Sequence, residues 1–185
     1  MAAPEAPPLR HLVLVLGDQL DEDASAFDGF DPAQDAVWMA EVLEESTHVW
    51  SSQPRSALFL AAMRHFAQAL RARGWPLHYR ALDDADNRGS LAAELDAAIT
   101  RLRPQGLVLT APGDHRVLTA LRGMARARGL PLELRDDRHF FSTVRDFAVH
   151  AKGRRTLRLE FFYRELRQRH RVLMDGRSEE HTSEL

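Results

Sequence analysis

The sequence contains no cysteine among its 185 residues. This absence excludes disulfide bonds, a thiolate nucleophile and any cysteine-ligated zinc or iron-sulfur centre within these residues. No apolar run approaches the roughly 20 residues that a membrane-spanning helix needs, and residues 1–8 lack the basic and apolar regions of a signal peptide. We therefore expect a cytoplasmic protein with no membrane partner.

A strong charge of either sign is also missing, because the formal net charge is -2. The chain as a whole therefore has no general attraction to nucleic acid. The charge is unevenly distributed, since residues 145–171 contain nine Lys or Arg and only three acids. A hydrophobic content of 44% and this length suit one α/β domain with a short extension.

Short apolar runs alternate with longer amphipathic stretches, as in βαβ units around a parallel sheet. The expected strands are residues 12–16, 36–40, 77–81, 107–110 and 132–135. The expected helices are residues 56–73, 90–102 with Ser90 as its cap, 115–128, and a last one near 157–171. In the first helix, one apolar face would hold Leu58, Ala62, Phe66, Ala69 and Leu70. The pattern predicts a doubly wound, five-stranded parallel sheet.

A polar turn follows the first expected strand. Gly17 ends the apolar run, and Asp18 and Gln19 come directly after it. In open α/β sheets, ligands bind in the crevice outside the carboxyl ends of the strands. We expect Gly17 to permit a tight turn, Asp18 to bind a ligand and Gln19 to support it. The alternative is a turn and cap without a ligand.

Two acids follow the second expected strand. Glu41 and Glu45 are four residues apart, a spacing that on a helix places both carboxylates on one face. They would lie close to the end of the first strand if the two strands are neighbours. The alternative is a solvated helix start, because acids are favourable at that end of the helix dipole.

Other polar clusters favour structural roles. Residues 83–87 contain three Asp and one Asn, but they lack the regular ligand spacing of a calcium loop, so we expect a turn that caps the next helix. The nine histidines show no metal-ligand pattern, and Asp114 with His115 has no accompanying nucleophile. We therefore expect neither a metal site nor a catalytic residue in this chain.

The last nine residues, RSEEHTSEL at 177–185, are the translation of AGATCGGAAGAGCACACGTCTGAACTC, the start of a common sequencing-library adapter. We interpret them as adapter read-through that belongs to no fold. The chain would then be an amino-terminal piece, because the reading frame would have run off the end of a genomic fragment at about Gly176. The alternative is a genuine polar tail.

Seven segments of the sequence, taken together in their order and spacing, carry a family resemblance. They are LVLGDQL at 14–20, MAEVLEE at 39–45, ALFLAAMRHFA at 57–67, LDDADNRGSL at 82–91, APGDHR at 111–116, DRHFF at 137–141 and EFFYRELR at 160–167. Together they resemble the iron-sulfur bacterial cryptochromes and prokaryotic (6-4) photolyases, also called deoxyribodipyrimidine photolyase-related proteins. The resemblance covers nearly all of residues 10–176.

This resemblance implies a Rossmann-like amino-terminal domain that holds a light-harvesting antenna, commonly a ribityl lumazine. Asp18 and Glu45 match the acids that contact the lumazine in the family. FAD, a 4Fe-4S cluster and most of the lesion pocket would lie in a helical carboxyl-terminal domain outside these residues, which agrees with the missing cysteines. The antenna would pass energy to FAD, which would then donate an electron to damaged DNA. The full-length protein would be a carbon-carbon lyase or a photoreceptor, and this chain alone would not be catalytic.

The expected organisation is an antenna domain at residues 10–139 and a basic, aromatic helical linker at 140–176. Candidate DNA-binding residues in the linker are Arg154, Arg155, Arg158 and Arg164, which lie on both sides of the aromatic residues 161–163 and could meet a phosphate backbone. The alternative is that the aromatics anchor this helix against the protein's own carboxyl-terminal domain while the arginines pair with acids there.

The chain departs from the family pattern at three places. Ser52-Gln53 stands where relatives usually show His-Lys, and His115 and His150 stand where they usually show tryptophan. Loss of a basic or aromatic wall weakens the binding of an anionic or stacked ligand.

Two further functions stay open. One is a stand-alone nucleotide- or ligand-binding regulatory module without catalysis; such modules usually place a glycine-rich loop at a helix start, whereas Asp18 would repel a phosphate. The other is a domain kept only for interaction, with residues 154–171 as its contact.

Overall fold

The computed structural model describes residues 8–49 and 51–174. The chain divides into two compact units between Asp136 and Asp137, and each unit is described by itself. The tail that we interpret as adapter read-through, residues 177–185, lies outside the described residues.

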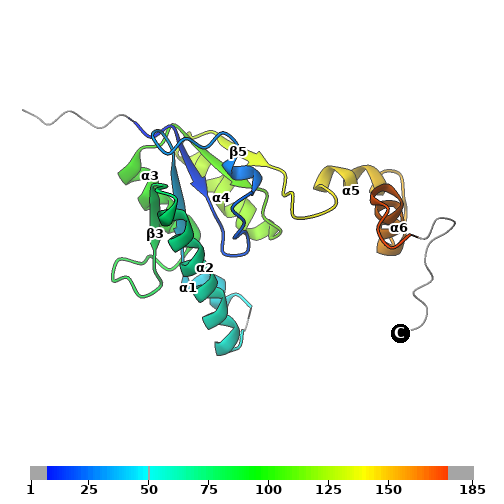
Figure 1. Ribbon diagram of the computed structural model, residues 1–185, viewed down its shortest axis with the longest axis horizontal. Helices are drawn as coiled ribbons and strands as arrows, with labels where there is room; N and C mark the ends of the chain where they lie inside the picture. The colour runs from blue at the N-terminus through cyan, green and yellow to red at the C-terminus, as the bar shows by residue number, and fades with distance from the viewer. Residues whose placement is uncertain (1–7, 50, 175–185) are drawn as a thin grey trace, which may run out of the picture. The chain divides into compact units, whose positions relative to one another are not determined.

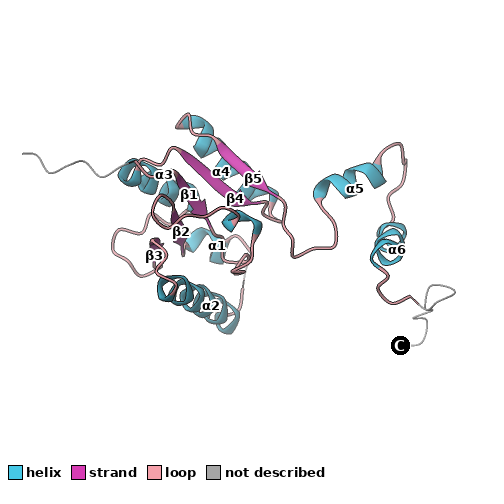
Figure 2. Ribbon diagram, turned by 45° about the horizontal axis from the view of Figure 1, so that its top comes forward, coloured by secondary structure: helices cyan, strands magenta, loops and turns pink. Residues whose placement is uncertain are grey.

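The first unit is built on a five-stranded parallel sheet with the order β3-β2-β1-β4-β5 (Figures 1 and 2). Its strands are β1 (His11–Leu14), β2 (Ala36–Ala40), β3 (Leu77–Arg80), β4 (Gly106–Thr110) and β5 (Leu132–Arg135). In the central register, Val13 of β1 lies opposite Val37 of β2 and Val108 of β4. The chain adds two strands on one side of β1 and then two on the other, so the direction of winding switches between β1 and β4. The predicted doubly wound parallel sheet is confirmed.

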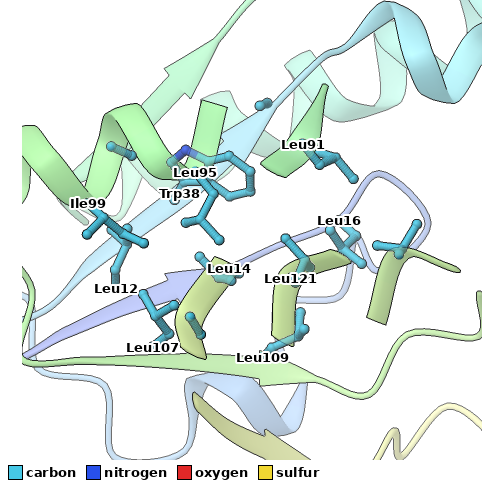
Figure 3. Packing of buried hydrophobic residues seen from close by; sticks show 14 of the residues in the cluster. Leu12, Leu14, Leu16, Trp38, Leu91, Leu95, Ile99, Leu107, Leu109 and Leu121 are labelled. Atoms are coloured by element: carbon cyan, nitrogen blue, oxygen red, sulfur yellow. The ribbon is translucent and has the colours of Figure 1, made fainter. Parts of the chain in front are cut away.

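Alternate residues of the central strands enter two hydrophobic cores, one on each face of the sheet. Leu12 and Leu14 pack on one face with Trp38, whereas Val13 packs on the other with Met39. Figure 3 shows the first core, where leucines of β1 and β4 meet side chains of the covering helices. Burying one leucine side chain stabilises the fold by roughly 1.5–3 kcal/mol, so these central strands hold the sheet together.

Helices cover both faces. The helix α2 (Gln53–Ala72) packs on the face of Val13, and α3 (Leu91–Leu102) and α4 (His115–Ala127) pack on the face of Leu12. The short helix α1 (Leu43–Thr47) follows β2, and a 3-10 turn, η1 (Ser25–Phe27), lies between β1 and β2. Ser90 caps α3 as predicted, because its Oγ accepts a hydrogen bond from the backbone of Ala93 at 3.3 Å.

The predicted apolar face of α2 was partly wrong. Leu58 and Ala62 are exposed, and the residues buried instead include Met63 and Ala67 beside Phe66. Alanine and leucine occur on several sides of this helix, so the spacing of apolar residues alone does not single out the buried side.

The second unit contains α5 (Val144–Ala151) and α6 (Leu159–His170). The sequence pattern predicted a helix near α6 but none at α5. A capping box between Thr143 and Asp146 begins α5. The rings of Phe147, His150 and Phe162 pack against one another, and His150 Nδ1 is 2.8 Å from a carboxylate oxygen of Glu165. Aromatic packing and this polar contact join the two helices.

Among the described residues, no helix is both long enough and apolar enough to cross a bilayer.

Candidate functional site

A cavity of about 280 Å³ opens at the carboxyl ends of β1, β2 and β4. Its walls come from the residues that follow these strands and from α1, α2, α3 and α4. Apolar side chains that line it include Leu16, Val42, Phe59, Leu60, Met63 and Val117. This is the edge of the sheet, beside the switch in winding, where doubly wound proteins bind their ligands.

The polar lining is mainly acidic. Asp18 follows β1, Glu45 lies on α1 and Asp114 is the N-cap of α4, while Arg55 in the first turn of α2 is the cation in the lining. The structure therefore brings the predicted residues Asp18 and Glu45 to one cavity, although they are far apart in the sequence. Carboxylates in this position can accept hydrogen bonds from ligand N–H and O–H groups.

Arg116, the neighbour of this lining, holds Glu45 in place. Its Nη2 donates to Glu45 Oε1 at 2.8 Å and lies 3.4 Å from Asp114 Oδ2. The hydrogen bond to Glu45 raises the pKa of Arg116, and the backbone N–H of Arg116 holds the pKa of Asp114 below its usual value. Two acids at the cavity are thus fixed by one cation.

Glu41 also lines the cavity, but its carboxylate is occupied by the protein. It is 1% exposed and accepts two hydrogen bonds from Arg64, at 2.7 and 2.8 Å, one from the Tyr79 hydroxyl and one from the Leu82 backbone at 2.8 Å. Burial raises the pKa of this carboxyl, but the hydrogen bonds outweigh burial and hold it below its usual value. Burial and the bond to Glu41 raise the pKa of Tyr79. Glu41 therefore ties β2 to α2 and β3.

The expectation that Glu41 and Glu45 share one helix face was wrong. The helix α1 begins at Leu43, so Glu41 lies before it, outside the helix. The two carboxylates have different partners, Arg64 for Glu41 and Arg116 for Glu45. The sequence spacing could not show this, because it does not reveal where the strand gives way to the helix.

Gln19 lies outside the cavity lining. Its Nε2 donates to the carbonyl oxygens of Thr110 at 3.0 Å and Ala111 at 3.3 Å, which joins the end of β1 to the end of β4. Its contribution to a site would be to position the loop that carries Asp18.

Gly17 lies in the expected tight turn, in which the Gln19 backbone N–H donates to the Leu16 carbonyl oxygen at 3.0 Å, but this turn does not need the conformational freedom of glycine. The φ of Gly17 is not in the left-handed region that only glycine adopts readily. Instead, an added Cβ would lie 2.5 Å from ring atoms of Phe59 and 2.8 Å from the sulfur of Met63. Glycine is favoured here because the side chains of Phe59 and Met63 on α2 pack closely against the end of β1.

Sequence reasoning missed several lining residues. Arg55, Phe59 and Met63 lie on α2, and nothing in the spacing of that helix indicated that its first turns face the ends of the strands. For Asp114 a signal was present in the sequence, because Asp114 follows the fourth predicted strand, whose carboxyl end must lie at the same edge of a parallel sheet.

The acidic loop after β3 is organised by its own hydrogen bonds. Asp84 Oδ2 accepts from the Ala81 backbone at 2.9 Å, and Asn87 Oδ1 accepts from the Gly89 backbone at 2.9 Å. Asn87 also donates to the carbonyl oxygen of Glu41 at 2.7 Å. The predicted Asx-rich turn before α3 is confirmed.

The four arginines predicted to contact DNA lie in the second unit and are exposed. Arg154 pairs with Glu165 at 3.0 Å, whereas Arg155 and Arg158 lie in the segment before α6 and Arg164 lies on α6. Their contact with DNA stays a prediction.

Similarity to known proteins identifies the family of this chain. A family model described as deoxyribodipyrimidine photo-lyase-related protein matches residues 13–182. The chain is 41% identical over 168 residues to a (6-4) photolyase from Agrobacterium fabrum (strain C58 / ATCC 33970), a match that covers 91% of this chain and 33% of that relative. The chain thus spans about a third of the length of the curated relative. By both comparisons, the chain belongs to the deoxyribodipyrimidine photo-lyase-related protein family.

Proposed function

We propose that the first unit binds a ribityl lumazine antenna in the cavity at the ends of β1, β2 and β4. The observation that best supports this is that Asp18 and Glu45, which match the family's lumazine-contacting acids, line one cavity beside an apolar wall. When bound, the lumazine would absorb light and pass the energy to FAD.

The residues present fit such a ligand. A lumazine offers a uracil-like edge of N–H and C=O groups and a chain of hydroxyls, so it needs carboxylate acceptors near an apolar surface. Asp18 and Glu45 provide acceptors, and Phe59 and Met63 provide an aromatic ring and a polarizable sulfur for stacking. The volume of about 280 Å³ is close to the lower end of the roughly 300–1,000 Å³ typical of small-molecule sites.

Other residues would prepare the site rather than contact the ligand. Arg116 fixes Glu45 through Oε1, and no hydrogen bond within the described part of the chain engages Glu45 Oε2. The Nε of Arg116 is a buried donor that has no hydrogen-bond partner among the described residues. Arg116 could therefore donate one further hydrogen bond. Glu41 and Arg64 hold the end of β2 against α2.

We further propose that the full-length protein is a cytoplasmic, light-dependent DNA photolyase. Family membership and the similarity to a (6-4) photolyase support this. FAD and a 4Fe-4S cluster would be held outside these residues, since a cysteine-ligated cluster needs thiolates that the chain lacks.

The test is a titration of the chain with ribityl lumazine, followed by absorption and fluorescence. The proposal predicts a saturable spectral shift that is weakened about 10-fold or more by Asp18→Ala and by Glu45→Gln, because each removes a charged acceptor. Asp23→Ala, an exposed acid outside the cavity lining, is the matched control. Absence of a shift, or equal shifts in all four proteins, would remove the antenna proposal.

A nucleotide-binding regulatory module is the second candidate, and Arg55 favours it, since it gives the cavity a cation that a phosphate could contact. The surrounding acids Asp18, Glu45 and Asp114 oppose a phosphate. Tighter binding of a nucleoside monophosphate than of ribityl lumazine, lost in Arg55→Gln, would select this candidate instead.

A further inference from the structure

A second cavity, of about 480 Å³, lies at the β3 side of the first unit. Here β3 is an edge strand: its neighbour on one side is β2, and no strand of the described residues pairs with its other side. The residues that define the cavity are Trp38, His78, Arg80, Arg88, Glu94 and Arg101. None of these lines the first cavity, so the two are separate sites.

The acid at the base of this cavity is already neutralised. Glu94 is 3% exposed, and its carboxylate accepts from Arg80 Nε at 3.3 Å and from the backbone N–H of Arg88. Arg80 also reaches Asp84 at 3.4 Å. Arg80 and Glu94 therefore compensate each other, and neither has a full charge to offer a ligand.

Two further cations in the lining are not compensated in this way. The guanidinium groups of Arg88 and Arg101 are in exposed residues, and neither has a hydrogen bond or ion pair to another described residue. Asp86 is the remaining acid of the lining. Burial and the nearby Arg101 lower the pKa of His78, so its ring is neutral at neutral pH and offers one N–H donor. The residues that line the cavity therefore carry a net charge of +1.

We propose that this second cavity binds a phosphomonoester, with Arg88 and Arg101 on the phosphate and His78 and Ala97 beside the organic part. Arginine is suited to this role because its planar guanidinium donates two parallel hydrogen bonds to phosphate oxygens. The volume lies within the roughly 300–1,000 Å³ range of small-molecule sites. The proposal is independent of the lumazine site, since it uses no residue of the first cavity.

The test is calorimetric titration of the chain with inorganic phosphate, adenosine monophosphate and adenosine at constant ionic strength, because salt screens such contacts. We expect saturable binding of the two phosphate-bearing probes and none of adenosine. The double variant Arg88→Gln/Arg101→Gln should weaken both by about 10-fold or more. Neither guanidinium supports the fold, so the far-ultraviolet circular dichroism of this variant should match the wild type.

Two single variants serve as controls. Arg122→Gln removes an exposed arginine of α4 outside both cavities, and Arg55→Gln removes the cation of the first cavity. The proposal is overturned if phosphate binding is not saturable, if the double variant binds as well as the wild type, or if binding is lost in Arg55→Gln instead. A short single-stranded oligonucleotide that binds through Arg88 and Arg101 more tightly than adenosine monophosphate would also overturn it, because the ligand would then be a phosphodiester.

Discussion

At the level of single residues, the acids around the first cavity differ in what holds them. Glu41 has its oxygens filled by Arg64, Tyr79 and the Leu82 backbone, whereas Glu45 keeps one oxygen outside the described hydrogen bonds. The first residue is a support and the second is a candidate ligand contact. The sequence could not distinguish the two roles, because it shows only two acids four residues apart and does not show their hydrogen-bond partners.

Glu41→Gln should lower the free energy of unfolding by about 2 kcal/mol at neutral pH, because Arg64 loses a charged, hydrogen-bonded partner. The folded-state pKa of Glu41 lies below the ordinary value of 4.5. Its stabilisation is therefore complete above that ordinary value and is lost as the pH falls through the lower, folded-state pKa. Urea unfolding at a series of pH values should show a shallower acid limb for Glu41→Gln than for the wild type.

Glu160→Gln, a change to an exposed acid of α6, is the control for this measurement and should leave the acid limb unchanged. Identical acid limbs for Glu41→Gln and the wild type would contradict the role assigned to Glu41.

Gly17→Ala tests the close approach of α2. The added Cβ would force Phe59 to move, and since that ring is 43% exposed it can swing outwards. We expect a loss of only about 1 kcal/mol in the free energy of unfolding, but a fall of about 10-fold in lumazine affinity, because one wall of the cavity is displaced.

Gly113→Ala is the matched control for Gly17→Ala, since Gly113 follows β4 at the same edge and an added Cβ there meets nothing within 4 Å. Unfolding in urea and lumazine titration should separate the two variants. Equal affinities would show that Phe59 is not part of the site.

At the level of elements, the sheet could be predicted from the apolar runs, because strands that are buried on both faces are continuous hydrophobic stretches in the sequence. The end of α3 and its cap at Ser90 also followed from local chemistry. The buried side of α2 and the helix α5 could not be predicted in this way, since both depend on which tertiary surface is available to pack against. The lining residues on α2, such as Phe59, were missed for the same reason.

The loop between β3 and α3 should depend on one amide. Asn87 donates to the carbonyls of Glu41 and Ala81 and accepts from the Gly89 backbone. Asn87→Ala removes all three bonds and should cost about 2 kcal/mol in thermal or urea unfolding. Asp83→Ala in the same loop changes a residue whose side chain is 82% exposed and should have little effect. A destabilisation by Asp83→Ala as large as that by Asn87→Ala would contradict the turn.

At the level of the whole molecule, the second unit leaves apolar side chains uncovered. Phe140, Phe141, Val144 and Val149 are each between 64% and 80% exposed. Exposed apolar side chains in this number promote association. We therefore expect the chain to self-associate with rising concentration in sedimentation velocity, and less so in the double variant Val144→Ser/Val149→Ser. A single monomeric species at high concentration would contradict this.

The central claim is that the cavity at the carboxyl ends of β1, β2 and β4 is an antenna site. The most direct measurement is a crystal structure of the chain grown with ribityl lumazine. The account predicts a ring system against Phe59 and Met63 with its N–H edge toward Asp18. An empty cavity at saturating lumazine, or a lumazine bound elsewhere on the chain, would contradict it.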